Sequence, residues 1–424
     1  MYAATRGSLY ALLLLSYTLL QGCVVQQWQS GGIGGYLDGH TLTDTLTELE
    51  SQTPYDRDRP MYLLNRGLVH HLAGNYQLSN QDLEAAKMAL QGVQALSITE
   101  GFTSSTINET FNDYSSTDSE RVLLHVVMAL NYLALQDLPS ARVEVLQSDL
   151  RMRESGDEET ELASARFIAG LVFELNSELS DAMISYRKAE QVLTRRQLAI
   201  PTLLQDRLLS SSRRLGLDSE HLTYLDRFQH RPAPLPDNHG EVLVLYLNGK
   251  VSDMYQRRIS IYAPSLEHNV TISQAFYPPR DRPLGSDTTL AFGDQGLSLE
   301  LIEDVDTLAR EALQASQGKR MALSLARVTT KHQLVKSSRE QDPLLGFLAD
   351  LASILTEVAD TRSWSLLPAT IQVGTIRLPA GTYSSTEDKG PDPSPLQQTV
   401  EVKAGATQLL IANSYGYQAA MTYN

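Results

Sequence analysis

The residue with the clearest chemistry is Cys23, the only cysteine among 424 residues. A lone cysteine has no disulfide partner within its own chain, so its thiol is available for another reaction. It directly follows a small residue, Gly22, and the stretch Leu20–Cys23 closes an apolar run. This pattern indicates a bacterial lipidation signal, in which the thiol is acylated and the chain is then cut before the cysteine. The alternative is an ordinary secretory signal with an incidental cysteine.

The segment before Cys23 has the layout of a signal peptide. Arg6 supplies a positive charge, and the apolar run Ser8–Leu20 follows it. A membrane-spanning helix needs about 20 apolar residues, so this run is too short to span a bilayer. We therefore expect a signal peptide over residues 1–22 and a lipidated flexible tether over residues 23–40. Position 24 lacks the aspartate that retains lipoproteins in the inner membrane, which predicts attachment to the outer membrane at its periplasmic face.

Sequence motifs for catalysis or cofactor binding are absent. There is no H-E-x-x-H zinc motif, no G-x-x-x-x-G-K-[ST] phosphate loop and no G-x-S-x-G nucleophile elbow. The nine histidines are scattered, and the adjacent pair His70 and His71 would point to different sides of a helix. We therefore expect no metal, no cofactor and no enzymatic activity.

Asp360, Arg362 and Trp364 form the one cluster of residue types suited to recognition. An arginine beside a carboxylate and an aromatic ring can anchor a partner through charge-assisted hydrogen bonds and a buried ring. The same residues can instead hold a corner of the fold through an ion pair and a buried indole. We favour the structural interpretation and keep a recognition patch as the alternative.

The charge balance limits the classes of partner. The chain carries 50 acidic and 35 basic residues, a net charge of −15. Nucleic acids need clustered Lys and Arg, so we expect no nucleic-acid binding. The expected partners are unidentified envelope proteins, with the lipid anchor in the membrane. Leu344–Ala359 is the longest later apolar stretch, but acidic residues interrupt it; we expect a helix buried in protein or lying against the membrane.

Residues 41–229 combine helical periodicity with a recurring spacing. A small residue precedes a second small residue by twelve positions at 67 and 79, 129 and 141, and 170 and 182. Antiparallel helices joined by a tight turn approach closely only where small side chains face each other, so this spacing predicts tetratricopeptide-like helical hairpins. A generic helical bundle is the alternative. The residues expected to pack within the hairpins are Gly67, Gly74, Tyr76, Ala86, Ala129, Tyr132, Ala141, Gly170, Ala182, Tyr186 and Ala189.

A proline-rich linker is expected at residues 230–240. Its three prolines stand at alternate positions, where they can neither continue a helix nor donate to a sheet. Residues 241–424 then have a mixed pattern, with strands expected within 241–290, helices within 297–360 and strands within 363–415. Two of those helices are expected at Leu301–Ala315 and Met321–Val335.

The expected fold class is therefore multidomain α+β. An N-terminal all-α tetratricopeptide-like solenoid precedes a β-sandwich-like domain with a helical insertion.

Two stretches of the sequence carry a family resemblance. The first begins E-R-V-L-L-H at Glu120 and continues to Asp137, and the second runs from Ala359 through Trp364 to Gly381. With the lipidation signal and the order of elements, they resemble an uncharacterised family of tetratricopeptide-repeat outer-membrane lipoproteins in Gram-negative bacteria. The resemblance covers nearly the whole mature chain, and it implies helical repeats and a lipid anchor. It implies no activity, because that family has no settled function.

The preferred function hypothesis is a protein-binding scaffold or assembly factor in a periplasmic envelope complex. In this hypothesis the concave face of the repeats captures a partner. One alternative is a regulator that activates a peptidoglycan synthase, suggested by a similar layout in lipoproteins of that kind. An envelope enzyme is the less favoured alternative.

Overall fold

The computed structural model describes residues 33, 37–38, 40–100, 114–156, 160–263, 268–280, 288–341, 358–387, 394–416 and 418–423. The signal peptide, Cys23, most of the tether and most of the Leu344–Ala359 stretch lie outside these residues. The expectations for those segments therefore stay predictions.

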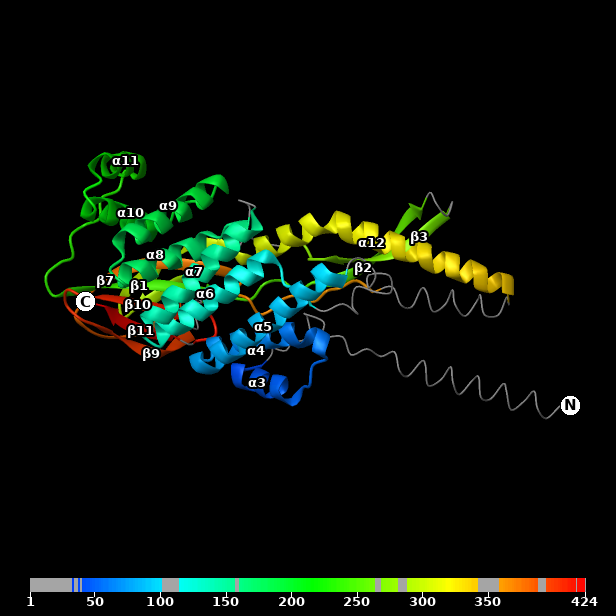
Figure 1. The fold of residues 1–424 in the computed structure, drawn as a ribbon. Helices are drawn as coiled ribbons and strands as arrows, with labels where there is room; N and C mark the ends of the chain where they lie inside the picture. The colour runs from blue at the N-terminus through cyan, green and yellow to red at the C-terminus, as the bar shows by residue number, and fades with distance from the viewer. Residues whose placement is uncertain are drawn as a thin grey trace.

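The N-terminal half of the described chain is a series of antiparallel helical hairpins (Figure 1). We call the first helix of each hairpin an inner helix and the second an outer helix. After α3 (Leu42–Ser51) and the 3-10 turn η1 (Asp56–Asp58), the hairpins are α4 (Arg59–Leu72) with α5 (Tyr76–Glu100), α6 (Asp118–Ala134) with α7 (Leu138–Ser155), α8 (Ala163–Leu175) with α9 (Leu179–Arg195), and α10 (Thr202–Arg214) with α11 (Asp218–Phe228).

Small residues allow the two helices of a hairpin to approach closely. A Cβ atom added to Gly170 would overlap the ring of Tyr186, and one added to Gly67 would lie 3.0 Å from the side chain of Leu83. The remaining small residues expected at these contacts are fully buried: Ala86, Ala129, Ala141, Ala182 and Ala189. Tyr76 and Tyr132 are half-buried at the edges of their hairpins. The hairpins are thus tetratricopeptide-like.

All four inner helices end in the same turn. A residue with positive φ follows each helix: Gly74, Gln136, Ser177 and Gly216, with φ between 60° and 77°. The next backbone N–H then donates to the carbonyl oxygen five residues earlier, as from Asn75 to His70 at 2.8 Å. This left-handed capping turn satisfies carbonyl groups at the helix end and returns the chain along the outer helix.

In the residues that the structure describes, the C-terminal half is built from three sheets and one long helix. A five-stranded sheet has the order β11-β10-β1-β7-β6, in which β1 runs parallel to β10 and antiparallel to β7. A four-stranded sheet has the order β5-β4-β8-β9, and β2 pairs with β3 alone among the described strands. The elements are β1 (His239–Asn248), β2 (Tyr255–Ala263), β3 (His268–Phe276), β4 (Thr289–Phe292), β5 (Gln295–Ser298), β6 (Glu300–Asp304), α12 (Val305–Gln341), β7 (Thr370–Pro379), β8 (Gly381–Glu387), β9 (Ser394–Val402), β10 (Thr407–Asn413) and β11 (Gln418–Tyr423).

Several expected boundaries in this half are wrong. The expected helix Leu301–Ala315 begins as strand β6, because this segment pairs with β7 and its last residue, Asp304, then caps α12 by accepting from the backbone N–H of Thr307 at 2.8 Å. The two separate helices expected at 301–315 and 321–335 are one continuous helix, α12. Strand β1 begins inside the expected linker, and β11 extends the strands beyond residue 415.

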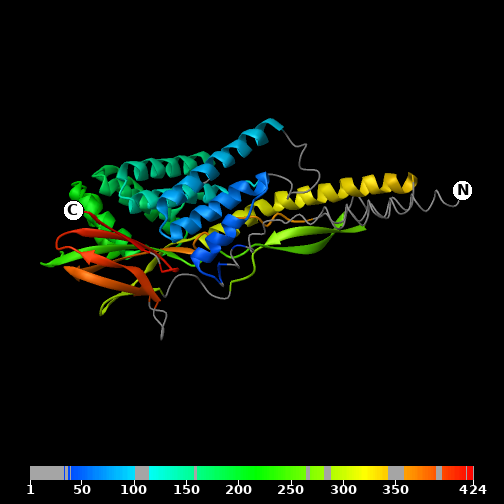
Figure 2. The ribbon, with the colours of Figure 1, turned by 90° about the horizontal axis from the view of Figure 1, so that it is seen from below.

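The sheets and helices form four layers (Figure 2). The five-stranded sheet packs one face on the four-stranded sheet, through residues such as Val244, Tyr246 and Phe292. Its other face, with Leu245 and Ile411, shares a core with the inner helices. The outer helices form the last layer, so the order is four-stranded sheet, five-stranded sheet, inner helices and outer helices. Strand β1 is therefore buried on both faces, which explains its uninterrupted apolar sequence.

Candidate functional site

The face formed by the inner helices is covered by the chain's own five-stranded sheet. On α8, every residue from Ala163 to Phe173 is buried. Asn413 of β10 donates to the carbonyl oxygen of Leu72 at the end of α4 at 3.2 Å, and Arg207 of α10 pairs with Glu241 of β1 at 2.6 Å. The concave face of the repeats, which the inner helices form, was expected to bind a partner. That expectation is wrong, because side chains of the five-stranded sheet already pack on this face and are buried there away from water.

Carboxylates of β6 cap two of the inner helices from outside the repeats. Glu303 accepts from the backbone N–H of Ser164 at 3.0 Å, and Glu300 accepts from that of Thr202 at 2.8 Å. Neither helix has a side-chain cap from its own N-cap residue. Burial raises the pKa of Glu303 to about 7, although Arg196 and the bonds from Ser164 act in the opposite direction. No local sequence signal identifies these caps, since they join residues 139 and 98 positions apart.

The cluster of Asp360, Arg362 and Trp364 also lies at the junction between the repeats and the C-terminal half. The guanidinium of Arg362 is buried and donates to Asp58 at 2.8 Å and to Asp360 at 2.8 and 2.9 Å. Burial alone would lower the pKa of Arg362, but the two carboxylates raise it above its ordinary value. Trp364 is also buried, and its backbone N–H donates to Glu120 at 2.8 Å. In this arrangement the arginine and the indole join the repeats to the C-terminal half.

A cavity of about 230 Å³ adjoins this cluster. It is lined by residues at the start of α6, by the first turns of α12 and by the segment 362–367, and it is partly open to solvent. Leu123, Leu308 and Leu313 are among its apolar lining residues, and Glu120, Arg320 and Trp364 are among the polar ones. Polar residues line this cavity in about the same number as apolar ones, and its volume is below the range of roughly 300–1,000 Å³ that is typical of small-molecule sites.

Glu120 organises the polar side of the cavity. Its carboxylate accepts from the Tyr114 hydroxyl at 2.9 Å, from the backbone N–H of Thr117 at 2.7 Å and from that of Trp364. Burial, and then the negative charge of Glu120, raise the pKa of Tyr114 well above its ordinary value. The spacing T-x-x-E from Thr117 to Glu120 is a capping-box signal that could have identified this start of a helix from the sequence.

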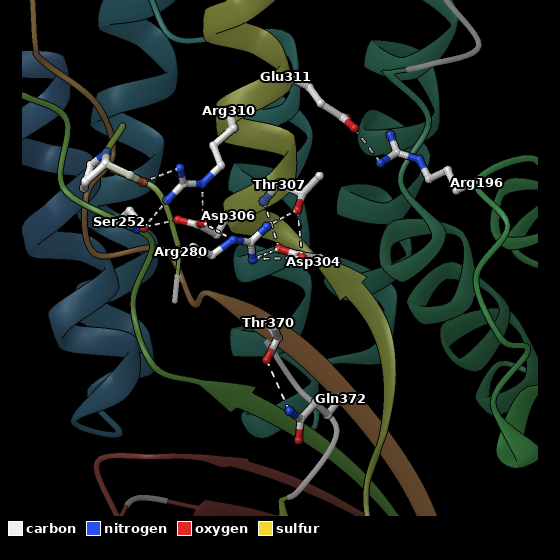
Figure 3. A network of polar contacts seen from close by, with 11 residues as sticks. Arg196, Ser252, Arg280, Asp304, Asp306, Thr307, Arg310, Glu311, Thr370 and Gln372 are labelled. Atoms are coloured by element: carbon white, nitrogen blue, oxygen red, sulfur yellow. Dashed lines mark hydrogen bonds and ion pairs between the residues drawn. The ribbon is translucent and has the colours of Figure 1, made fainter. Parts of the chain in front are cut away.

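A polar network fixes the N-terminal end of α12, which lies beside the cavity (Figure 3). Arg280 forms hydrogen bonds with Asp304 and Thr307, and Arg310 joins Asp306 at 2.7 Å to Ser252 at 2.8 Å. Burial of Asp306 acts to raise its pKa, but the bonds from Arg310 and Ser252 hold it below the ordinary value. The first turns of α12, which line the cavity, are thereby held in place.

The outer helices expose apolar side chains at recurring positions. We call this set the outer ridge: Leu78 and Met88 of α5, Val143, Leu146 and Leu150 of α7, and Ile184 of α9, exposed by 40 to 61%. Met88 and Leu150 each follow the small residue of their outer helix by nine positions (88 − 79 and 150 − 141). Val143, Leu146 and Leu150 lie on one face of α7, as their spacing of three and four residues requires.

The described residues contain no group of three metal-ligating side chains close enough to hold an ion. His71 is buried and bonds to Asn131 at 2.6 Å. Likewise, no described helix is both long and apolar enough to cross a bilayer.

No family model and no curated protein matches the chain. Similar solved structures include the apo form of RapI, with 12% identity and a TM-score of 0.35 over 44% of this chain and 47% of RapI. MamA from Desulfovibrio magneticus RS-1 has 13% identity and a TM-score of 0.27 over 44% of this chain and 82% of MamA. Bacillus thuringiensis PlcR, in complex with the peptide PapR7 and DNA, has 13% identity and a TM-score of 0.27 over 44% of this chain and 64% of PlcR.

These three are tetratricopeptide-like helical repeat proteins. The chain spans about half the length of RapI. With TM-scores well below 0.5, the likenesses indicate neither an activity nor a partner for this chain.

Proposed function

We propose that this protein is a lipid-anchored scaffold of the bacterial envelope that binds a protein partner through the outer ridge. The observation that carries the proposal is the set of exposed apolar side chains on α5, α7 and α9. Apolar side chains exposed on one layer of a protein can serve as an interaction site, because burying them against a partner removes them from water.

The anchoring part of the proposal rests on the sequence around Cys23. Acylation there would attach the chain to the outer membrane at its periplasmic face, as the lipidation signal predicts. Metabolic labelling with radioactive palmitate tests this step. We expect label in the wild-type protein and none in Cys23→Ser; label retained in that variant would contradict the anchor.

The partner-binding part is tested by charging the ridge. We expect Leu146→Asp with Leu150→Asp to lower the recovery of a crosslinked partner from solubilised envelopes at least tenfold, because each carboxylate would have to be desolvated in the interface. The matched control is Leu235→Asp, a similarly exposed leucine of the linker. Equal recovery with the ridge and linker variants would contradict the ridge as the interface, and circular dichroism shows whether the variants stay folded.

A further inference from the structure

A long arm extends from the C-terminal half. We define the arm as the β2–β3 hairpin together with α12 from Lys319 onward. The hairpin and the helix lie side by side and point away from the two larger sheets (Figure 1, Figure 2). Apolar side chains join them, since Leu325 of α12 packs with side chains of the hairpin: Ile259, Ile261, Val270 and Ile272. The hairpin and the helix are therefore held together as one projecting element.

The described side chains of the arm carry only positive charge. On β2, on β3 and on residues 319–326 of α12 they include no Asp or Glu and four bases, which are Arg257, Arg258, Lys319 and Arg320. Over all residues of 255–276 and 319–357, eight basic residues stand against five acidic ones, whereas the whole chain has a net charge of −15. An anionic surface would therefore attract the arm and repel the rest of the molecule.

The partners that the structure gives to these bases are neutral. Arg257 donates to the side-chain oxygen of Gln274 at 3.0 Å. Arg320 donates to the carbonyl oxygen of Asp360 at 3.2 Å. The carboxylate of Asp360 is itself paired with Arg362. The positive charge of the arm is thus available to an anionic ligand.

Exposed tyrosines accompany the two arginines on β2. Tyr255 and Tyr262 are exposed by 51 and 58%. Side chains alternate along a strand, so Tyr255 and Arg257 lie on one face of β2, and Arg258 and Tyr262 lie on the other. A protein partner would dock on one face of this ribbon, whereas the headgroup layer of a bilayer can contact both. Tyrosine is also enriched at that depth, because its ring is apolar and its hydroxyl is polar. The arrangement therefore favours a lipid surface over an acidic protein.

We propose that the arm binds the surface of a bilayer that contains anionic phospholipids. The bases contact the lipid phosphates, and the tyrosines lie among the headgroups. Each Lys or Arg near such a surface strengthens binding roughly fivefold. The proposal needs neither the outer ridge nor acylation of Cys23, so its failure would leave the proposed scaffold function untouched.

A fluorophore on the arm reports this contact locally. In the full chain with Cys23→Ser, the substitution Ser260→Cys places the only thiol at an exposed position of β2, where it takes an NBD label. We expect a saturable rise in emission with vesicles of phosphatidylglycerol and phosphatidylcholine. Because salt screens exposed charges, about 0.5 M NaCl should suppress this rise.

Two controls separate the arm from other contacts with lipid. Vesicles of phosphatidylcholine alone should give no rise, and they reveal any binding through the apolar run Ser8–Leu20. The same label at Ser219→Cys should not respond, because α11 lies at the end of the molecule opposite the arm (Figure 1). Equal responses to the two kinds of vesicle, or at the two labels, would overturn the proposal.

Charge removal completes the test. The triple variant Arg257→Gln, Arg258→Gln and Lys319→Gln should weaken binding to the phosphatidylglycerol vesicles at least tenfold. The matched control removes three exposed bases far from the arm and should leave binding unchanged: Arg213→Gln in α10, Arg231→Gln in the linker and Lys403→Gln after β9. Circular dichroism shows whether both variants are folded. Equal effects of the two triple variants would overturn the proposal. A response to soluble polyglutamate as strong as that to the vesicles would also overturn it, in favour of an acidic protein partner.

Discussion

The inner and outer helices share one repeat pattern but have opposite surroundings. Inner helix α8 is buried from Ala163 to Phe173 against the sheet and its neighbours, whereas outer helix α7 exposes Val143, Leu146 and Leu150. Both kinds of helix use the same small-residue contacts and the same connecting turn. The repeat pattern thus determines how a hairpin forms, but the rest of the chain determines which of its faces remains available to a partner.

The largest expected effect comes from breaking an ion pair on the buried side. In Arg362→Met, the carboxylates of Asp58 and Asp360 lose their buried counter-ion, and we expect the free energy of unfolding to fall by about 3–5 kcal/mol. Urea denaturation measures this loss.

The matched control for this variant is an ion pair on the outer side. Arg142 of α7 pairs with Glu178 at 2.7 Å, with side chains exposed by 40 and 29%. Because solvent screens this pair, Arg142→Met should cost at most about 1 kcal/mol. Similar losses in the two variants would show that burial does not distinguish the inner junction from the outer surface.

The sequence predicted the hairpins well because their causes are local. A small residue recurs twelve positions after another, and both the close contact at Gly170 and the turn after it involve residues within one hairpin. The covering of the inner face depends instead on contacts such as that between Ser164 and Glu303. No periodicity within a window of 18 residues reports such a contact.

Two signals for that covering were nevertheless present in the sequence. Val242–Leu247 is apolar at every position, which is typical of a strand buried on both faces. Ala163–Phe173 carries one charged residue, Arg166, and a helix that is apolar nearly all round is buried on all sides. The candidate cavity had no comparable signal, because its lining comes from segments more than two hundred residues apart.

A pH-dependent difference in stability sharpens the comparison at the inner layer. The folded pKa of Glu303 is about 7, against an ordinary 4.5. Its contribution to stability is therefore fully present below pH 4.5 and is lost as the pH rises through 7, by about 3 kcal/mol in total. Glu303→Gln lacks this loss, so the unfolding free energy of the variant relative to wild type should rise by about 3 kcal/mol between pH 4 and pH 8.

Other groups also titrate between pH 4 and pH 8. They affect the unfolding free energies of the variant and the wild type equally, so their contribution cancels in the difference between the two. Burial lowers the pKa of His71 to about 4, so its contribution changes with pH in the opposite direction, being lost as the pH falls from 6.5 to 4. The control Glu300→Gln weakens a cap at an exposed helix end by removing its charge, and it should cost at most about 0.5–1 kcal/mol. A pH-independent difference for Glu303→Gln would refute the assignment.

A smaller effect tests the contact that inner and outer helices share. In Gly170→Ala the new methyl group overlaps the buried ring of Tyr186, and we expect a loss of about 1–3 kcal/mol. The control is Gly318→Ala in α12, where nothing lies near the new atom, and alanine should stabilise the helix by about 0.5–1 kcal/mol. Thermal unfolding of the two variants should therefore shift in opposite directions, and a gain at both positions would contradict close packing at Gly170.

The smallest effect concerns the turn that connects every inner helix to its outer helix. Ser177 is exposed and has a φ of 62°, a left-handed conformation that costs a residue with a side chain about 1 kcal/mol. Ser177→Gly should therefore stabilise the protein by about 0.5–1 kcal/mol, measured by urea denaturation. Gly216 occupies the same turn in the fourth hairpin, with φ 68° and no atom near a new Cβ, so Gly216→Ser should destabilise it by a similar amount through the backbone alone. Opposite changes of equal size would establish that the turn is energetically the same in both hairpins, so that only the covering of the faces distinguishes the inner helices from the outer ones.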